Sequence, residues 1–405
     1  MKKIFSIFAL LVCVISGCSC DKDDDAVRTA ISSSYVIAFN SKDSDNYFFA
    51  DPFGTYIGVT GYDEEDVYDV QDDLNKLTTK YHSLLDRNYY YKYADGTIMN
   101  NIRVINDSYG SGQAIEVDDI IIEVLKEGIK YTKLSNGKFN ILAGSIVDVW
   151  DVRFNILASS YYGIDPTEDQ INEGLACVPS VSEIDSVLVI DEDNNTVTFN
   201  SFSGCDSGAS ITLGALAKSY FLDKLNADEE ISDLDDYILD AGQSSIIVNG
   251  YNPTRERGLY NIAVLNSYTS DKRDYAVQLQ LKGKNAISTS SGDQKGYVKQ
   301  DGTRRHHIID ATSGYPNNYL LATTVITDSA MIADIITTTL MTMESLEEIK
   351  TYLTLLQSNQ IEVKVLLEVN VNDSLVIYAN SEMKKVIGKV FDGVTVEEFS
   401  YGAQA

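Results

Sequence analysis

The sequence lacks the glycine-rich loops by which many nucleotide-binding and hydrolytic enzymes are identified. It contains no G-x-G-x-x-G, no G-x-x-x-x-G-K-[ST] and no G-x-S-x-G. A dinucleotide-binding dehydrogenase, a P-loop ATPase and an α/β-hydrolase are therefore disfavoured, because each uses such a loop to approach a phosphate or to expose a nucleophile.

Histidine and cysteine are also scarce. The chain has 3 histidines and 5 cysteines, and no two cysteines form a C-x-x-C pair. This composition disfavours a zinc site. Cys177 and Cys205 lie well inside the chain, and the sequence is equally compatible with a disulfide between them and with two buried thiols.

Basic residues are few relative to acidic ones. The chain has 32 Lys and Arg against 60 Asp and Glu, which gives a formal net charge of −28. Such a surface repels polyanions, so nucleic acid is not expected as a partner. An acidic protein that handles a phosphate-bearing molecule needs a metal ion to offset the repulsion, so we expect carboxylates that hold a divalent cation. With 44% hydrophobic residues among 405, the chain can bury a sizeable core.

The N-terminus has the pattern of an export signal. A basic head at residues 1–3 precedes an apolar run over residues 4–15, which is too short to span a bilayer as a helix. The next residues complete I-S-G-C, which fits the lipobox of bacterial lipoproteins, so Cys18 is predicted to carry the lipid. An ordinary cleaved signal is the alternative. We assign residues 1–17 to the signal peptide and 18–45 to an acidic tether, and expect an extracytoplasmic protein anchored to the bacterial cell membrane by lipid.

The rest of the chain is predicted to form one domain, residues 46–400, because no repeat, Pro-rich linker or low-complexity tract divides it. Helical periodicity predicts helices at 64–85 and 117–134, and two shorter helical candidates lie at 213–225 and 328–343. Strand patterns occur at 187–190, 196–199, 237–240, 245–249, 260–265, 276–281, 361–369, 375–379 and 384–390. Helices and strands are interspersed without a regular βαβ period, which indicates an α+β fold.

One pair of oxygen-bearing side chains has a spacing suited to a metal ion. Asp334 and Thr338 are four residues apart in a predicted helix, so both side chains leave the same face. Such a pair could hold a hard cation. An ordinary Asp and Thr on a solvated helix face is the alternative that the pattern alone leaves open.

Six short segments become informative when their order is considered. They are residues 53–55 (F-G-T), 136–150 (N-G-K-F-N-I, then G-S-I-V-D-V-W), 213–218 (L-G-A-L-A-K), 240–245 (D-A-G-Q-S-S), 289–293 (T-S-S-G-D) and 307–314 (H-I-I-D-A-T-S-G). In wording and order they resemble the ApbE family, the flavin transferases that move FMN from FAD onto a protein threonine or serine. The likeness runs from about residue 53 to residue 343. The helix with Asp334 and Thr338 falls where the family reads A-D-A-x-x-T.

The resemblance implies an FAD:protein FMN transferase with a mixed, largely antiparallel sheet flanked by helices. It implies a Mg²⁺ ion held by the side chains of Asp334 and Thr338 and by the backbone carbonyl of Ala215. FAD would be the substrate and AMP the leaving product. The expected acceptors are other exported proteins that carry a D-x-x-[ST]-G-A-[ST] motif.

The resemblance also implies residue roles. Asp334 and His307 are the expected catalytic residues, and His307 could take the acceptor's hydroxyl proton or steady the phosphate. A hydrogen-bonded structural histidine is the alternative for His307, a helix-surface lysine for Lys218, and a core position for Asp148. Contacts to FAD are expected from Phe53, Asp148, Lys218, Thr289, Asp293 and His307.

The chain departs from the family's wording at four places. Ser219 stands where a Gly usually follows Lys218, Ala311 replaces a Pro, Phe53 replaces a Met, and one Ser is added near Thr289.

Two other functions stay open at this point. One is an FAD pyrophosphatase, in which water replaces the acceptor hydroxyl and FMN and AMP are released. The other is a surface lipoprotein that binds flavin or another ligand without catalysis.

Overall fold

The structure is a computed structural model that describes parts of the predicted tether and most of the chain after it. Residues 31–34, assigned to the tether, form a strand that pairs with residues 58–61 and so belong to the fold. The described residues are 31–34, 38–40, 47–49, 52–62, 67, 69–156, 163–205, 208–242, 244–269, 274–293 and 295–402. The predicted signal peptide and the lipidation site Cys18 lie outside them. Within the described ranges, no helix is long and apolar enough to cross a membrane.

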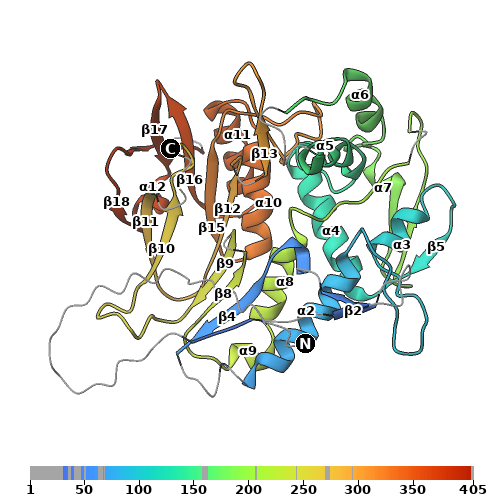
Figure 1. The fold of residues 1–405 in the computed structure, drawn as a ribbon, viewed down its shortest axis with the longest axis horizontal. Coiled ribbons are helices and arrows are strands. Elements are labelled where there is room, and N and C mark those ends of the chain that lie inside the picture. Colours follow the sequence, from blue (N-terminus) through green and yellow to red (C-terminus); the bar gives the residue numbers. More distant parts are fainter. Residues whose placement is uncertain are drawn as a thin grey trace, which may run out of the picture.

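A nine-stranded sheet forms the centre of the fold (Figure 1). Its strands are β1 (Ile31–Ser34), β4 (Ile57–Gly61), β8 (Tyr237–Ala241), β9 (Ser245–Asn249), β12 (Asn285–Ser291), β15 (Ala322–Thr327), β16 (Lys364–Val371), β17 (Ser374–Ala379) and β19 (Thr395–Glu398), in that spatial order. Among these strands only β17 and β19 pair in parallel. The predicted α+β class with a largely antiparallel sheet is confirmed.

Helices cover one face of this sheet and a small second sheet covers the other. The helices are α2 (Gln71–Leu85), α8 (Ala217–Asn226), α10 (Ala330–Met341) and α11 (Leu346–Ser358). The second sheet has the order β10-β11-β18 (Tyr260–Leu265, Tyr275–Leu281 and Ile387–Val390). Val325 and Leu367 face the helices, whereas Ile326 and Leu366 pack in the cluster formed with the second sheet. Every residue of β15 is buried, because both faces of the sheet are covered.

A second group of elements lies beside the helical face, to the right in Figure 1. It consists of α3 (Ile102–Asp107), α4 (Asp119–Leu134), α5 (Gly144–Ile156), α6 (Glu168–Ala176), α7 (Ile184–Val187) and a sheet of order β5-β7-β6 (Ala114–Glu116, Thr196–Phe199, Leu188–Asp191). Its apolar core is continuous with residues of α8 and α10, among them Tyr220, Met331 and Ile335. The shorter elements are β2 (Ala38–Asn40), β3 (Tyr47–Phe49), η1 (Pro52–Gly54), α9 (Glu229–Ser232), β13 (Gly296–Val298), β14 (Arg304–His306) and α12 (Ser381–Lys384).

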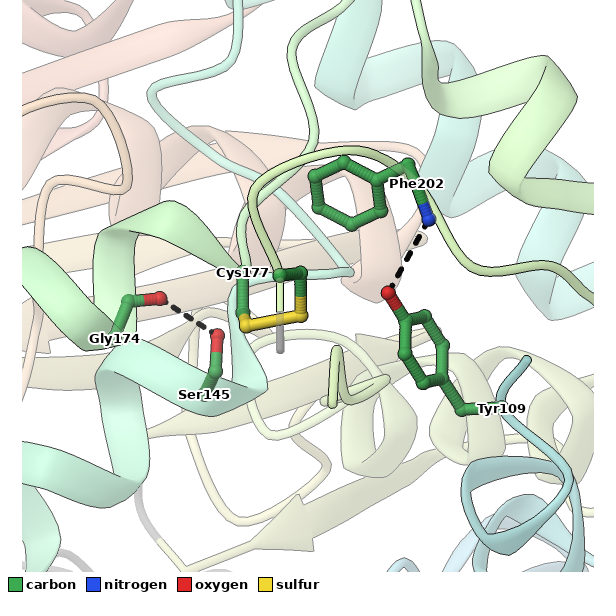
Figure 2. Close-up of a disulfide and its surroundings, with 6 residues drawn as sticks. Tyr109, Ser145, Gly174, Cys177 and Phe202 are labelled. Carbon is green, nitrogen blue, oxygen red and sulfur yellow. Dashed lines mark hydrogen bonds between the residues drawn. A yellow bond between two sulfur atoms is a disulfide. The ribbon is translucent and has the colours of Figure 1, made fainter. Parts of the chain in front are cut away.

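A disulfide holds this second group together (Figure 2). Cys177, at the end of α6, is bonded to Cys205, in the loop after β7, with an S–S distance of 2.12 Å. Beside it, the hydroxyl of Ser145 in α5 donates to the carbonyl of Gly174 in α6 over 2.9 Å. Of the two possibilities that the sequence left open, the structure therefore has the disulfide. It ties α6 to the small sheet, and the hydrogen bond ties α6 to α5.

Most predicted elements are present, with shifted ends. The predicted hairpin is β6 and β7, and the predicted helices are α2, α4, α8 and α10. The helix predicted from residue 213 begins only at Ala217, because residues 213–216 form a turn closed by bonds to the Leu213 carbonyl. The strands β12 and β15 escaped prediction because they are rich in Ser and Thr and lack apolar alternation.

Candidate active site

Asp334 is the centre of a buried polar cluster that lies where α8, α10 and β12 meet. Only 3% of this residue is exposed. The ammonium of Lys218 pairs with Oδ2 of Asp334, and the Ser219 hydroxyl donates to the same oxygen over 2.9 Å. The Ser288 hydroxyl donates to Oδ1 over 3.0 Å. A buried carboxylate needs such partners to offset its desolvation, so its orientation is defined by groups from three elements. The alternative considered for Lys218, an ordinary lysine on a helix surface, is therefore wrong.

A helix cap holds α8 and α10 in this arrangement. The carboxylate of Asp223, in α8, accepts hydrogen bonds from the Ser329 hydroxyl over 2.6 Å and from the backbone N–H groups of Ala330 and Met331. These N–H groups belong to the first turn of α10, which has no helical acceptors for them. An acidic group there also interacts favourably with the helix dipole. The cap therefore fixes the end of α10 that carries Asp334.

The neighbouring threonines of α10 differ in their hydrogen bonding. Thr337 is buried, and its hydroxyl donates to the Asp334 carbonyl over 3.0 Å and accepts from the Ser290 hydroxyl over 2.9 Å. Thr338 is partly exposed, and its hydroxyl forms no hydrogen bond with any described residue. Thr338, one turn after Asp334, thus keeps an oxygen available for a ligand.

Ala215 lies in the turn that leads into α8 and is partly buried. This turn is closed by bonds from the Leu216 and Ala217 N–H groups to the Leu213 carbonyl. The Ala215 carbonyl itself accepts no hydrogen bond from the described part of the chain. The described residues contain no group of three or more His, Cys, Asp or Glu side chains that could hold a metal. A cation site here would consist of one carboxylate, one hydroxyl and one carbonyl.

His307 follows β14 and is anchored through its own backbone and ring. Its N–H donates to the Lys295 carbonyl over 3.1 Å, and its Nδ1 lies 3.2 Å from the same oxygen. Because a carbonyl can only accept, Nδ1 carries the proton and Nε2 keeps a lone pair. Burial lowers the pKa of His307, and the charges of Lys295 and Lys218 lower it further while Asp151 opposes them. The imidazole is therefore neutral near pH 7 and suited to accept a proton.

His306 has a structural role. It is 2% exposed, its Nε2 lies 2.6 Å from the Asn317 carbonyl, and its Nδ1 accepts from the Ile308 N–H over 3.3 Å. Both ring nitrogens are therefore satisfied inside the protein. Burial lowers the pKa of His306 to about 4, which keeps the ring uncharged.

Phe53 belongs to the packing between α2 and α8. Its ring stacks on Phe221 with centroids 5.6 Å apart and meets the edge of His82 at 5.2 Å. Its backbone is left-handed, with φ of 53°, which is unusual for a bulky residue. The Phe53 N–H donates to Nδ1 of His82 over 3.1 Å, which supports this conformation. Phe221 follows Lys218 by one helical turn in α8. The contact of Phe53 with FAD stays a prediction.

Asp148 lies on α5 at the surface. Its side chain is 55% exposed and accepts two hydrogen bonds, of 2.6 and 2.5 Å, from the guanidinium of Arg87. The core position considered for Asp148 is therefore wrong; the core residue of this segment is Trp150, which donates to the Gly314 carbonyl over 2.8 Å. One turn after Asp148, Asp151 pairs with Lys295 over 2.9 Å, which connects α5 to the His307 segment.

Thr289 lies on the face of the sheet opposite to Asp334. Along β12, Ser288 and Ser290 point toward α10, so the alternating Thr289 shares the other face with Ile287, which packs in the cluster of the second sheet. Its hydroxyl lies 2.9 Å from that of Thr324. The structure does not bring Thr289 together with Asp334, and its contact with FAD stays a prediction.

Asp293 follows the end of β12 and is exposed. The Ser291 hydroxyl donates to its carboxylate. Nearby, the buried Glu368 accepts a hydrogen bond from the Ser267 N–H over 2.9 Å, and burial raises the pKa of Glu368 to about 7. Asp293 thus belongs to a cluster of polar residues on the sheet face opposite to Asp334. Its contact with FAD also stays a prediction.

Sequence reasoning missed the residues that hold Asp334. Ser288 directly precedes the T-S-S-G-D segment, and Ser219 was noted only as a departure from a glycine. Serine is common in all kinds of structure, so neither residue carries a signal of its own. The only available signal was their adjacency to motif residues.

A family model described as the ApbE family matches residues 53–365. An FAD:protein FMN transferase of Vibrio cholerae is 26% identical over 284 residues, which cover 70% of this chain and 77% of the relative. One of Klebsiella pneumoniae is 24% identical over 253 residues, which cover 62% and 71%.

Solved structures show the same fold. The ApbE protein of Thermotoga maritima superposes with a TM-score of 0.61 at 20% identity, covering 88% of this chain and 100% of the other. The flavin transferase ApbE of Vibrio cholerae gives a TM-score of 0.61 at 20% identity, covering 89% and 100%.

Proposed function

The chain belongs to the ApbE family, and from this we propose that it transfers FMN from FAD to a threonine or serine hydroxyl of other proteins, with residues 46–400 as the catalytic domain. The acceptor oxygen would bond to the phosphorus on the FMN side of the pyrophosphate, and AMP would leave with the bridging oxygen. The observation that carries the proposal is the fixed Asp334 carboxylate, inside the span that the family model matches. Among the described residues, the Thr338 hydroxyl and the Ala215 carbonyl have no hydrogen-bond partner.

The residues around Asp334 fit a magnesium ion. The candidate ligands are the Asp334 carboxylate, the Thr338 hydroxyl and the Ala215 carbonyl, an all-oxygen set of the kind that Mg²⁺ prefers. They supply one negative charge, so phosphate oxygens of FAD would complete the coordination. A bound Mg²⁺ would neutralise the charge that develops on the pyrophosphate as it is broken.

Lys218 is suited to contact the phosphates. Its ammonium already pairs with Asp334, and 15% of its side chain is exposed. An ammonium has three protons, so it can keep Asp334 and bind a phosphate oxygen at the same time. Its position at the start of α8 brings a positive charge to an otherwise acidic protein, at the point where a pyrophosphate must be held.

His307 is suited to take the proton of the acceptor hydroxyl. Its Nδ1 is occupied by the Lys295 carbonyl, so the lone pair of Nε2 is the basic site. With a lowered pKa the ring is uncharged near neutral pH and ready to accept a proton. We assign the remaining flavin contacts to Phe53, Asp148, Thr289 and Asp293, as the family resemblance implies.

We place the enzyme outside the cytoplasmic membrane, anchored through a lipid on Cys18. The I-S-G-C sequence at residues 15–18 supports the anchor. The Cys177–Cys205 disulfide supports an oxidising compartment, because such bonds persist mainly in exported proteins. The acceptors would be exported proteins with a D-x-x-[ST]-G-A-[ST] motif, which a lipid anchor keeps on the same surface.

Intact-mass analysis with nucleotide chromatography tests this function. The purified protein is incubated with FAD, Mg²⁺ and a fragment that carries D-x-x-T-G-A-T. We expect an FMN-sized mass gain on the fragment with equimolar AMP, and a loss of at least about 100-fold in rate for Asp334→Ala. Asp185→Ala, which removes an exposed carboxylate paired with Lys133, is the control and should retain the activity.

The products separate the transferase from the two other functions. Free FMN and AMP without a mass gain would identify a pyrophosphatase that uses the same site. Unchanged FAD with wild-type protein would contradict any catalytic function and leave flavin binding as the better account.

A further inference from the structure

Ser219 is a buried residue that contacts the candidate metal ligand directly. None of its surface is exposed, and its hydroxyl lies 2.9 Å from Oδ2 of Asp334 and 3.1 Å from the Leu216 carbonyl. The hydroxyl has one proton and two acceptors within reach. The carboxylate is the stronger acceptor because it is charged. The family's motif has a glycine here, which cannot form this bond.

The carboxylate of Asp334 is held from both sides. Ser288 donates to Oδ1 from β12, and Ser219 donates to Oδ2 from α8. Without Ser219, Lys218 would be the sole described residue bonded to Oδ2. Its long side chain supplies a charge but does not fix the plane of the carboxylate. With two serines on opposite oxygens, rotation of the carboxylate breaks at least one hydrogen bond.

We propose that Ser219 is a positioning residue that orients the Asp334 carboxylate for metal binding. This inference rests on the proposed function, because it concerns the same metal site. Oδ2 accepts from Lys218 and Ser219, whereas Oδ1 accepts from Ser288 alone among the described residues, so Oδ1 keeps a lone pair for a cation. A ligand that is already oriented loses less freedom when the ion binds, and residues that orient ligands in this way typically contribute 10- to 100-fold to metal affinity.

Binding of Mn²⁺ alone to the purified protein, measured by the EPR signal of the free ion, tests the proposal. We expect Ser219→Ala and Ser219→Gly to bind Mn²⁺ about ten-fold more weakly than wild type. Ser83→Ala is the matched control. Ser83 is also a buried helical serine, with its hydroxyl bonded to the Thr79 carbonyl over 2.6 Å, and no carboxylate of a described residue accepts from it. Its Kd for Mn²⁺ should equal that of wild type.

A kinetic measurement adds a second readout. For Ser219→Ala we expect the Mg²⁺ concentration at half-maximal rate to rise about ten-fold, with the rate at saturating Mg²⁺ changed much less. A structural role alone would lower the melting temperature without this shift. An unchanged Kd, or a Kd weakened equally in Ser83→Ala, would overturn the proposal.

Asp334→Ala distinguishes failure of this inference from failure of the proposed function. If Asp334→Ala abolishes Mn²⁺ binding and Ser219→Ala leaves it unchanged, only the role of Ser219 is wrong. If Asp334→Ala leaves Mn²⁺ binding unchanged, the metal site itself is wrong, and the role of Ser219 falls with it.

Discussion

The two sides of the candidate active site are built differently. On the carboxylate side, made of Lys218, Ser219, Ser288 and Asp334, the Lys218–Asp334 pair has side chains only 15% and 5% exposed. On the histidine side, made of Asp148, Asp151, Lys295 and His307, the Lys295–Asp151 pair is 45% and 37% exposed. The first side is enclosed by helices and sheet, and the second lies between α5 and the segment after β14.

The difference shows how burial determines rigidity in an active site. A buried carboxylate must have hydrogen-bond partners, and these partners hold it in one orientation. Exposed charges can exchange protein partners for water at little cost, so they can turn toward a ligand when one binds. The carboxylate side is therefore preorganised for a cation. On the histidine side, His307 is anchored to the Lys295 carbonyl, while the exposed Lys295–Asp151 pair can turn toward a ligand.

The largest expected effect concerns the scaffold of the histidine side. The Cys177–Cys205 bond closes a loop with a sequence separation of 28, so replacing both cysteines by serine should lower the free energy of unfolding by about 3–4 kcal/mol. Denaturant unfolding of the double variant against oxidised wild type measures this. A loss below about 1 kcal/mol would show that apolar packing, rather than the disulfide, holds α6 in place.

Removing one cation from each side gives the most direct comparison. Lys218→Met leaves Asp334 buried without its counter-ion and should lower the free energy of unfolding by about 3 kcal/mol. Arg87→Met, at the exposed Asp148, should cost less than about 1 kcal/mol. Thermal unfolding of the two variants side by side tests the contrast. Equal losses would contradict the division into a buried and an adaptable side.

The pH dependence of the transfer rate tests whether His307, on the histidine side, is the base. A base must be uncharged, so the rate should fall as the pH drops through the pKa of His307, which burial holds below the ordinary value of 6.5. His307→Gln should lower kcat by about 100-fold and remove this acidic limb. Rates measured from pH 5 to pH 8 check both effects. If the rate of His307→Gln still falls at low pH, another group titrates there and His307 is a structural residue.

Local sequence patterns predicted the regular, amphipathic parts of the fold. The hairpin β6–β7 and the helices α2 and α4 have clear apolar periods, because each buries one face and exposes the other. The helix α10 was predicted from its run of helix-compatible residues, and it is buried on nearly all sides. The strands β12 and β15 were missed because Ser288, Ser290, Thr323 and Thr324 are buried polar residues. Their hydroxyls are satisfied by partners far away in sequence, which no local pattern records.

In the candidate site, too, local patterns identified residues but not the contacts between distant segments. The sequence identified Asp334, Lys218 and His307 through motif wording, but their alternatives could not be separated. The Lys218 contact to Asp334 spans 116 residues, and the Ser288 contact spans 46. The motif wording pointed to Asp148, but its exposure depended on how α5 packs against the rest of the molecule.

The sequence by itself determined the charge, the export signal pattern, the α+β class and the family motifs, because these depend on composition and on residues close together in the chain. Only the tertiary structure decided that Cys177 and Cys205 are bonded, that Thr289 lies on the far face of the sheet, and that two serines hold Asp334. These features depend on which faces are buried against one another, and burial is decided by the packing of segments distant in sequence.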